Sequence, residues 1–411
     1  MRFFLLFITF IVIGGLLEWY VYSALSSRWN SWSNWLRNTA KISYFVLLGL
    51  SILSICMMFF FNKFQPRSVL NFWFSFVILN LIVKTGFAFF LLIDDLRRLG
   101  IFTRNKVTGQ VSPEGGITRS DFLVKTGLAA ATIPFVSLSW GMIAGPYRYK
   151  VFSEKVTIPN LPKAFDGLKI AQISDIHSGS FYNKEAVQKG IDLLMAQNAD
   201  VIFFTGDIVN DKASEMEPYI EMFSQLKAPL GVYSILGNHD YGDYVSWESE
   251  EAHQENNKAV RELHGRMGWR LLLNEHVYLE KDGQKIGLIG VENWGKGFHQ
   301  EGDLAKAYEG IDAPVKLLLS HDPTHFDEVV KKDFKDINMM FAGHTHGAQM
   351  GIETAGFKWS PISLRYRKWA GLYEENGQYL YINRGFGFLG YAGRLGIMPE
   401  ITVMELKAES A

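Results

Sequence analysis

The chain has 411 residues, of which 48% are hydrophobic, and its 41 basic and 42 acidic side chains leave a net charge of −1. This balance offers no basic surface of the kind that binds nucleic acid, so no nucleic-acid partner is expected. The single cysteine, Cys56, excludes an intramolecular disulfide and a thiolate metal site. An apolar first third precedes a remainder of ordinary globular composition, so the chain is expected to have two distinct parts.

Four apolar runs in the first part have the length of a membrane-spanning helix. They cover residues 3–25, 42–61, 69–93 and 126–145, and each is close to the roughly 20 residues that cross the hydrocarbon core of a bilayer. A buried helical domain is the alternative, but long runs with Phe and Trp crowded at their ends favour the membrane. The sequence predicts a multi-pass integral membrane domain over residues 1–145, with the bilayer as its partner, and a second domain over residues 146–411.

Two ionisable residues, Glu18 and Lys84, fall within the predicted spans. A charge in hydrocarbon is costly, so such groups pair with each other, line a cavity or extend to the headgroups. The two could pair with each other, but for Glu18, beside Trp19 and Tyr20, we expect an extension to the interface. A transporter built on the four helices would need more polar lining than these residues provide.

The charges near the ends of the spans predict the sidedness of the protein. The first and third loops carry eight Lys and Arg residues, and the opposite side carries five. Because the more positive side usually stays in the cytoplasm, the second domain is expected to be extracytoplasmic. Residues 118–131 agree, since they resemble a twin-arginine export signal in which Ser120 replaces the second arginine.

From residue 151 onward, apolar strand-like runs alternate with helical stretches. The helical stretches are residues 184–197, 215–226, 248–267 and 324–332. This alternation predicts an α/β domain of ordinary size. Two later runs, residues 379–382 and 400–406, are expected as strands that complete a second sheet.

Five short clusters of potential metal ligands follow five of the apolar runs. They are Asp175-Ile176-His177, Gly206-Asp207, Gly237-Asn238-His239-Asp240, Ser320-His321-Asp322 and Gly343-His344-Thr345-His346. In an extended chain residues i and i+2 point to the same face, so Asp175 with His177, and His344 with His346, can aim into one cavity. Imidazole and carboxylate donors suit Zn²⁺, Mn²⁺ or Fe. One such cluster alone is usually a turn or a polar pair, but five in order predict a metal site.

The ordered pattern D-x-H, G-D, G-N-H-D, H and G-H-x-H resembles that of the calcineurin-like metallophosphoesterase superfamily, and its layout with a membrane domain resembles the exported, envelope-type members from bacteria. The resemblance implies a four-layer αββα sandwich of two mixed sheets and a dinuclear site for two divalent metal ions (Mn²⁺, Zn²⁺ or Fe). One ion would be held by Asp175, His177, Asp207 and His346, and the other by Asp207, Asn238, His321 and His344.

The same resemblance assigns catalytic roles to His239 and Asp207. Asp207 would bridge the two metals, and His239 would be the general acid for the leaving oxygen. In related phosphatases an aspartate three residues after the bridging one supports this histidine, but here that position is Asn210. Asp211 and Asp240 are the alternative partners that the sequence offers.

The implied activity is that of a membrane-anchored hydrolase of phosphate esters, either phosphodiesters or lipid-linked pyrophosphates. Hydroxide generated from water at the metal pair would attack phosphorus, and His239 would protonate the leaving group. Two alternatives remain open. The chain could be a phosphate- or envelope-ligand-binding protein with little turnover, or a cytoplasm-facing pyrophosphohydrolase of the UDP-diacylglucosamine type, which conflicts with the predicted sidedness.

Substrate specificity is expected in three loops near the site, namely residues 241–247, 292–300 and 384–391. Arg384 and Arg394 are candidates to bind a non-bridging phosphate oxygen, because a guanidinium matches its geometry, although both could equally be ordinary salt-bridge partners. The aromatic side chains of the third loop, if exposed, would admit a lipid tail.

Overall fold

The computed structural model describes residues 2–61, 66–109 and 118–409, with side chains from residue 12 onward. The chain divides into two compact units. The first consists of Met1–Gln65 and Phe72–Trp140, and the second of Pro66–Asn71 and Gly141–Ala411.

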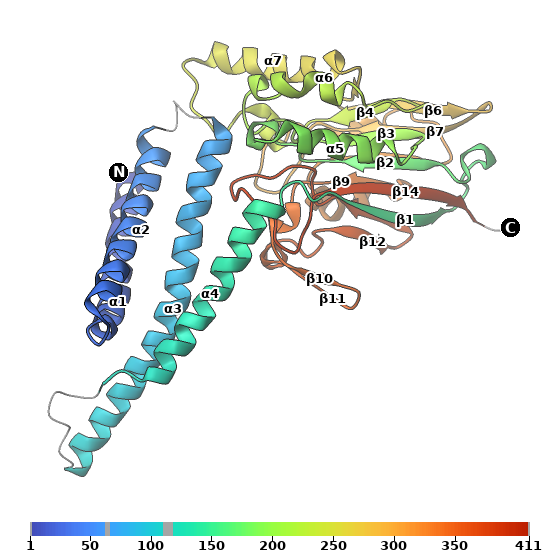
Figure 1. The fold of residues 1–411 in the computed structure, drawn as a ribbon. Coiled ribbons are helices and arrows are strands. Elements are labelled where there is room, and N and C mark those ends of the chain that lie inside the picture. The colour runs from blue at the N-terminus through green and yellow to red at the C-terminus, as the bar shows by residue number, and fades with distance from the viewer. Residues whose placement is uncertain (1, 62–65, 110–117, 410–411) are drawn as a thin grey trace. The chain divides into compact units, whose positions relative to one another are not determined.

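The first unit is built from four long helices (Figure 1). They are α1 (Arg2–Trp29), α2 (Asn34–Phe60), α3 (Arg67–Thr108) and α4 (Asp121–Ala144). By length and composition α2, α3 and α4 can each cross a membrane, with mean hydropathies of 2.3, 2.3 and 1.5. The span expected at residues 3–25 lies in α1, but its first side chains fall outside the described ones. At 42 residues, α3 is much longer than the predicted span and longer than a bilayer core requires.

The two ionisable residues of this unit form a pair. The Lys84 ammonium donates to the Glu18 carboxylate, and the Tyr44 hydroxyl donates to the same carboxylate at 2.6 Å. Each charge is therefore compensated within the helices, as its cost in hydrocarbon requires. The expectation that Glu18 extends to the headgroups is therefore wrong, because its carboxylate pairs with Lys84 and Tyr44.

The second unit contains two six-stranded sheets, both mixed. The first has the order β1 (Lys150–Ile158), β14 (Glu400–Ala408), β2 (Lys169–Ile173), β3 (Val201–Thr205), β4 (Val232–Ile235) and β5 (Arg270–Leu271). The second has the order β12 (Gly371–Glu375), β13 (Gln378–Ile382), β9 (Met339–Ala342), β8 (Lys316–Leu319), β7 (Gln284–Gly290) and β6 (Glu275–Lys281). Strands β2 to β5 run parallel, and so do β13, β9, β8 and β7.

The last strand, β14, corrects the expectation that residues 400–406 complete the second sheet. It lies in the first sheet, parallel to β1 and antiparallel to β2. A strand carries no signal in its own sequence for the sheet that it joins, because partners are chosen by tertiary packing. The other late strand, β13, does join the second sheet, as expected.

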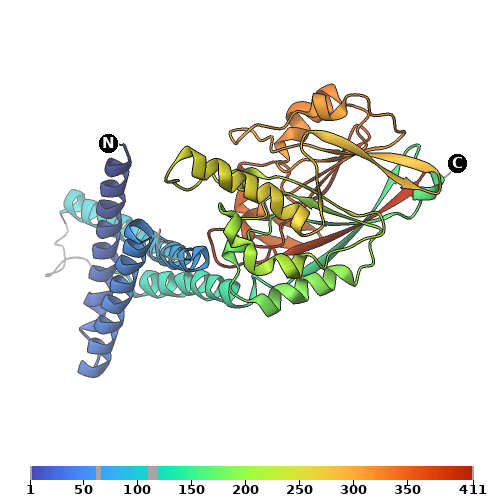
Figure 2. The same ribbon diagram turned by 90° about the horizontal axis from the view of Figure 1, so that it is seen from above.

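Alternating side chains along the strands produce four layers. Val201 and Phe203 of β3 point into the core between the sheets, whereas Ile202 and Phe204 point to the outer face. The outer face of the first sheet is covered by α5 (Lys184–Met195), α6 (Ile220–Phe223) and α7 (Glu250–Arg266). The outer face of the second sheet is covered by α8 (Leu304–Tyr308) and the π-helical turn at Phe326–Val330. In Figure 2 the green and yellow helices α5–α7 lie apart from the orange segment that covers the second sheet. This is the predicted αββα sandwich.

Three of the four predicted helices form. Residues 324–332 are helical with a π-helical centre at Phe326–Val330, and the other two, α5 and α7, begin with capped first turns. The Asn183 side chain accepts the N–H of Ala186 at 3.0 Å before α5, and Ser249 caps α7 in the same way. The stretch 215–226 is broken into short 3₁₀ turns and the four-residue α6, since Pro218 interrupts it. A separate two-stranded hairpin, β10 (Ile352–Thr354) with β11 (Phe357–Trp359), stands apart from both sheets (Figure 1).

Candidate metal centre

The potential ligands lie at the carboxyl ends of five strands. Those of the first sheet follow the parallel neighbours β2, β3 and β4, and those of the second follow the parallel neighbours β8 and β9. Parallel strands end at the same edge of a sheet, where ligand sites of open α/β sheets form. The sandwich therefore brings the ends of both sheets to one seam.

One group of donors consists of Asp175, His177 and His346, whose ligand atoms all lie within 4.8 Å of one another. His346 Nε2 is 3.2 Å from Asp175 Oδ1 and 3.0 Å from His177 Nε2. All three residues are buried. Both donors of the D-x-H motif thus lie in this group together with the second histidine of the H-x-H motif, whereas the first, His344, lies in the other group.

A second group consists of Asp207, His321 and His344, again within 4.8 Å. His321 Nε2 lies 3.1 Å from Asp207 Oδ2, and His177 Nε2 of the first group lies 3.5 Å from the same oxygen. One carboxylate oxygen thus touches both groups. The remaining predicted ligand, Asn238, is adjacent, with its Oδ1 2.8 Å from His344 Nδ1.

The chemistry of these donors fits divalent cations. The facing Nε2 atoms of His177 and His346 can share at most one proton, and the buried His321 Nε2 has the Asp207 carboxylate beside it at 3.1 Å. Burial disfavours a charge on His321, but the Asp207 carboxylate outweighs it and raises the pKa of that imidazole to about 10. The cluster thus requires positive charge, which Zn²⁺, Mn²⁺ or Fe would supply to nitrogen and oxygen donors.

The backbone of the site is held in an uncommon conformation. Asp175, His177, Asp207, His344 and His346 all have positive φ, between 46° and 72°. Each such non-glycine residue costs on the order of 1–3 kcal/mol and persists only where its surroundings impose it. We conclude that the sheets and loops around the site stabilise a geometry that the ligand residues would not adopt by themselves.

Asp240 is the residue that braces these loops. Its buried carboxylate accepts the backbone N–H groups of Asp207, Ile208 and Gly237, each at 2.8 Å. It thereby ties the ends of β3 and β4 together. The sequence offered Asp240 as a candidate partner of His239, but its carboxylate accepts hydrogen bonds from main-chain N–H groups instead.

His239 stands beside both donor groups. Its ring lies 4.9 Å from that of His177 and 4.4 Å from that of Tyr244, measured between centroids. The Nδ1 atom is 2.8 Å from the main-chain oxygen of Asn210. Because a carbonyl oxygen only accepts, Nδ1 carries a hydrogen, and Nε2 is the atom free to exchange a proton. A carbonyl thus orients His239, in place of the Asp211 or Asp240 carboxylate.

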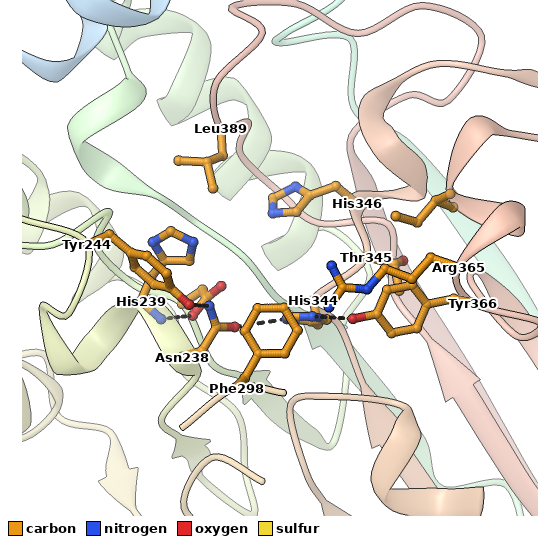
Figure 3. A pocket seen from close by; sticks show the side chains of 12 residues that line it. Asn238, His239, Tyr244, Phe298, His344, Thr345, His346, Arg365, Tyr366 and Leu389 are labelled. Atoms are coloured by element: carbon orange, nitrogen blue, oxygen red, sulfur yellow. Dashed lines mark hydrogen bonds between the residues drawn. The ribbon is translucent and has the colours of Figure 1, made fainter. Parts of the chain in front are cut away.

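A cavity of about 240 Å³ opens over these residues (Figure 3). It is lined by Asp207, Asn238, His239, Tyr244, Phe298, His344, Thr345, His346, Ile362, Arg365, Tyr366 and Leu389. Each of the three predicted loops supplies one lining side chain, namely Tyr244, Phe298 and Leu389. The fourth wall, residues 362–366, was not predicted, because this segment, which begins in the 3₁₀ turn Pro361–Leu364, carries no motif or periodicity.

The two arginines proposed for phosphate binding do not line the cavity. Arg384 is buried and pairs with Glu400 at 2.6 Å and Glu353 at 2.5 Å. Arg394 is also buried and donates to the main-chain oxygens of Gly385 and Gly387. Both guanidinium groups therefore support the loop at residues 384–394. The aromatic residues of that loop, Phe386, Phe388 and Tyr391, are buried too and cannot receive a lipid tail.

Comparison with known proteins agrees with this fold and site. Residues 168–348 match the family model for calcineurin-like phosphoesterases, and residues 1–146 match the model for the transmembrane domain of calcineurin-like phosphoesterases. The chain belongs to the calcineurin-like phosphoesterase family, within the membrane-associated members. It is an enzyme of the metallophosphoesterase class, and the family implies binding of divalent metals.

Several relatives match all or part of the chain. The metallophosphoesterase YkuE of Bacillus subtilis is 28% identical over 268 residues, which cover 64% of this chain and 87% of the relative. A transmembrane protein with metallophosphoesterase domain from Danio rerio is 27% identical over 383 residues, or 88% of this chain and 79% of the relative. The phosphodiesterase YaeI of Escherichia coli is 26% identical over 239 residues, or 58% of this chain and 82% of the relative.

The glycine of the last motif provides a test of the packing at the site. A Cβ at Gly343 would lie 2.0 Å from Ser174 Oγ and 2.3 Å from Asp175 Oδ2. We expect Gly343→Ala to displace the Asp175 carboxylate and to lower metal content and activity about 10–100-fold, as loss of ligand support does elsewhere. Metal analysis of the purified chain measures this effect. Gly265→Ala, where a Cβ meets nothing within 4 Å, is the matched control, and an equal loss there would contradict the explanation.

Proposed function

We propose that this protein hydrolyses phosphodiesters, with an active site that faces away from the cytoplasm. The observation that carries the proposal is the position of Asp207 Oδ2, which touches His177 of one donor group and His321 of the other, with His239 beside them. This arrangement suits two adjacent cations and a proton donor, the requirements of phosphate-ester hydrolysis.

The ligand residues would hold the metals as follows. Asp175, His177 and His346 would hold one ion, and Asn238, His321 and His344 the other, with Asp207 shared. Two bound divalent ions supply charge that polarises the phosphate and lowers the pKa of water. The protein contributes the dry, rigid setting, since most of the donor side chains are buried.

His239 would deliver a proton to the departing oxygen. The Asn210 carbonyl fixes its Nδ1–H, so the proton is transferred from Nε2 of the imidazolium. The ring of Tyr244, 4.4 Å away, restricts its rotation. Both contacts hold the imidazole in position before the reaction, so no further entropy is lost to orient it when the proton is transferred.

Arg365 would bind a non-bridging oxygen of the substrate, the role first given to Arg384 and Arg394. Its guanidinium carbon lies 5.0 Å from the ring centroid of Phe298 and 5.4 Å from that of Tyr366 (Figure 3). Within the described part of the chain no carboxylate pairs with it. A planar cation held by two rings, and unpaired, suits recognition of a phosphate.

We expect Arg365→Ala to raise KM for a water-soluble phosphodiester about tenfold or more, because a charge-assisted hydrogen bond is lost. Steady-state kinetics of the full chain would measure the change. The matched control is Arg367→Ala, which removes an exposed arginine that does not line the cavity. A similar effect of both variants would show that general surface charge, and not this contact, is responsible.

The cavity wall favours diesters over monoesters. The cavity is lined by apolar and aromatic side chains, namely Phe298, Ile362, Leu389, Tyr244 and Tyr366. Both organic substituents of a diester can therefore pack against the cavity wall. The test is hydrolysis of an aryl phosphodiester and an aryl phosphomonoester by the full chain, with Mn²⁺ or Zn²⁺ and with a chelator. We expect metal-dependent turnover that is faster with the diester. Binding of phosphate without turnover would support the alternative of a ligand-binding protein.

Sidedness is tested separately. The first and third loops carry more Lys and Arg residues than the opposite side and are expected in the cytoplasm. We therefore expect protease added to intact cells to cleave the second unit and leave the first protected. Cleavage only after the membrane is opened would instead support a cytoplasmic active site and the pyrophosphohydrolase alternative.

A further inference from the structure

The hairpin formed by β10 and β11 has its polar and apolar faces reversed relative to an ordinary surface hairpin. Ile352 pairs with Trp359, and Thr354 with Phe357, so these side chains share one face. Ile352, Phe357 and Trp359 are 53%, 57% and 45% exposed. The other pair, Glu353 with Lys358, is turned inward and is partly buried.

Specific contacts hold the inward face in this orientation. Glu353 pairs with the buried Arg384, and the Lys358 ammonium donates to the main-chain oxygen of Ala370 and lies 4.6 Å from the ring centroid of Trp369. A shift of one residue in register would expose these charges and bury the apolar side chains. The ion pair and the lysine contacts therefore fix the apolar face outward.

The segment that follows the hairpin in the chain adds a further exposed apolar side chain. Leu364 is 87% exposed, and with the hairpin it gives four of the six exposed large hydrophobic side chains among the described residues from Lys150 onward. We call Ile352, Phe357, Trp359 and Leu364 the apolar rim. Such a concentration on one short segment marks an interaction surface.

The charges next to the apolar rim indicate the kind of partner. Arg365 and Arg367 follow Leu364 on either side of Tyr366. Both are exposed and have no carboxylate partner within the residues that the structure describes. Unpaired arginines beside exposed Trp, Phe and Leu are the composition of segments that lie in the interface of an anionic bilayer. A protein partner would require acidic groups facing these arginines.

We propose that the apolar rim enters the headgroup region of an anionic phospholipid bilayer. The chain is already bound to a membrane through its first unit, so this surface meets lipid at high local concentration. Ile362 and Arg365, which line the cavity, lie in the same segment as Leu364. Insertion therefore brings the mouth of the cavity to the level of lipid phosphates, and makes a phospholipid or lipid-linked phosphodiester the substrate class. This second step rests on the proposed function, whereas insertion itself does not.

Insertion is tested with full-length protein in nanodiscs of phosphatidylcholine and phosphatidylglycerol. The native Cys56 is replaced by serine, and a single cysteine at Phe357→Cys carries an environment-sensitive fluorophore. The control label is at Glu309→Cys, an exposed residue at the end of α8. We expect lipids with spin-labelled acyl chains to quench position 357 at least twofold more than position 309. The proposal would be overturned by equal quenching at the two positions. It would also be overturned if neither lipid nor aqueous quenchers reach position 357, since this would mean that a protein covers it.

Catalysis gives a second readout. In the variant Phe357→Ser/Trp359→Ser we expect about a tenfold loss of kcat/KM on a chromogenic phospholipid in vesicles, and no change on a soluble aryl phosphodiester. Equal losses on both substrates would overturn the inferred substrate class, because they would indicate a structural defect. If the proposed hydrolysis itself is wrong, neither substrate is turned over, yet quenching at position 357 persists.

Discussion

Replacing Asp207 with asparagine will lower metal-dependent hydrolysis by about 10³-fold or more, and the purified variant will carry less metal than the native chain. The reason is the single oxygen of Asp207 that lies 3.1 Å from His321 and 3.5 Å from His177. An amide cannot supply the negative charge that this position places between two cations. Hydrolysis of an aryl phosphodiester, together with metal analysis, measures both effects.

The matched control is Asp282→Asn. Asp282 also has a positive φ, 49°, but is exposed and lies in a turn outside the site. Asparagine tolerates this backbone region well, so both variants are expected to fold. Native activity and metal content in Asp207→Asn would refute its role as the shared ligand.

Removing the imidazole of His239 will slow hydrolysis according to the leaving group. With an alkyl leaving group, which needs a proton, His239→Ala is expected to lose about 10²–10⁴ in rate. With a nitrophenyl leaving group, which departs readily as an anion, the loss should be much smaller. A comparison of kcat/KM for the two diesters separates proton donation from simple positioning.

His276→Ala provides the control for this variant. His276 also bonds a main-chain carbonyl through Nδ1, that of Ala307 at 2.8 Å, but it lies on β6 away from the cavity. Its loss should leave both rates unchanged. If His239→Ala slows the two substrates equally, the histidine has a role in binding or structure instead of acid catalysis.

The sequence contained most of the information needed to locate the site. Five motifs follow five strand-like runs, and parallel strands bring their ends together, so convergence of Asp175, His177, Asp207, His321 and His346 follows from spacing and topology. Gly206 and Gly343, which precede Asp207 and His344, lie where neighbouring atoms leave no room for a Cβ. A glycine at a fixed place in a motif is a sequence signal for such close packing. The four-layer order was expected only from the family resemblance, because a strand such as β3, Val201–Thr205, is apolar on both faces and has no alternation in its sequence.

The parts that were missed depend on contacts between distant segments. No local signal indicates that β14 joins the first sheet, or that Arg384 meets Glu400 and Glu353. The partner of His239 is a main-chain carbonyl, and every residue has one, so composition could not identify it. Arg365 was overlooked because its segment has neither motif nor periodicity.

Whether the two donor groups bind a pair of metal ions can be measured by anomalous X-ray scattering from crystals of the full chain grown with Mn²⁺. We expect two manganese peaks, one among Asp175, His177 and His346 and the other among Asp207, His321 and His344. Absence of manganese from both groups, or a peak only at some other place in the protein, would contradict this expectation.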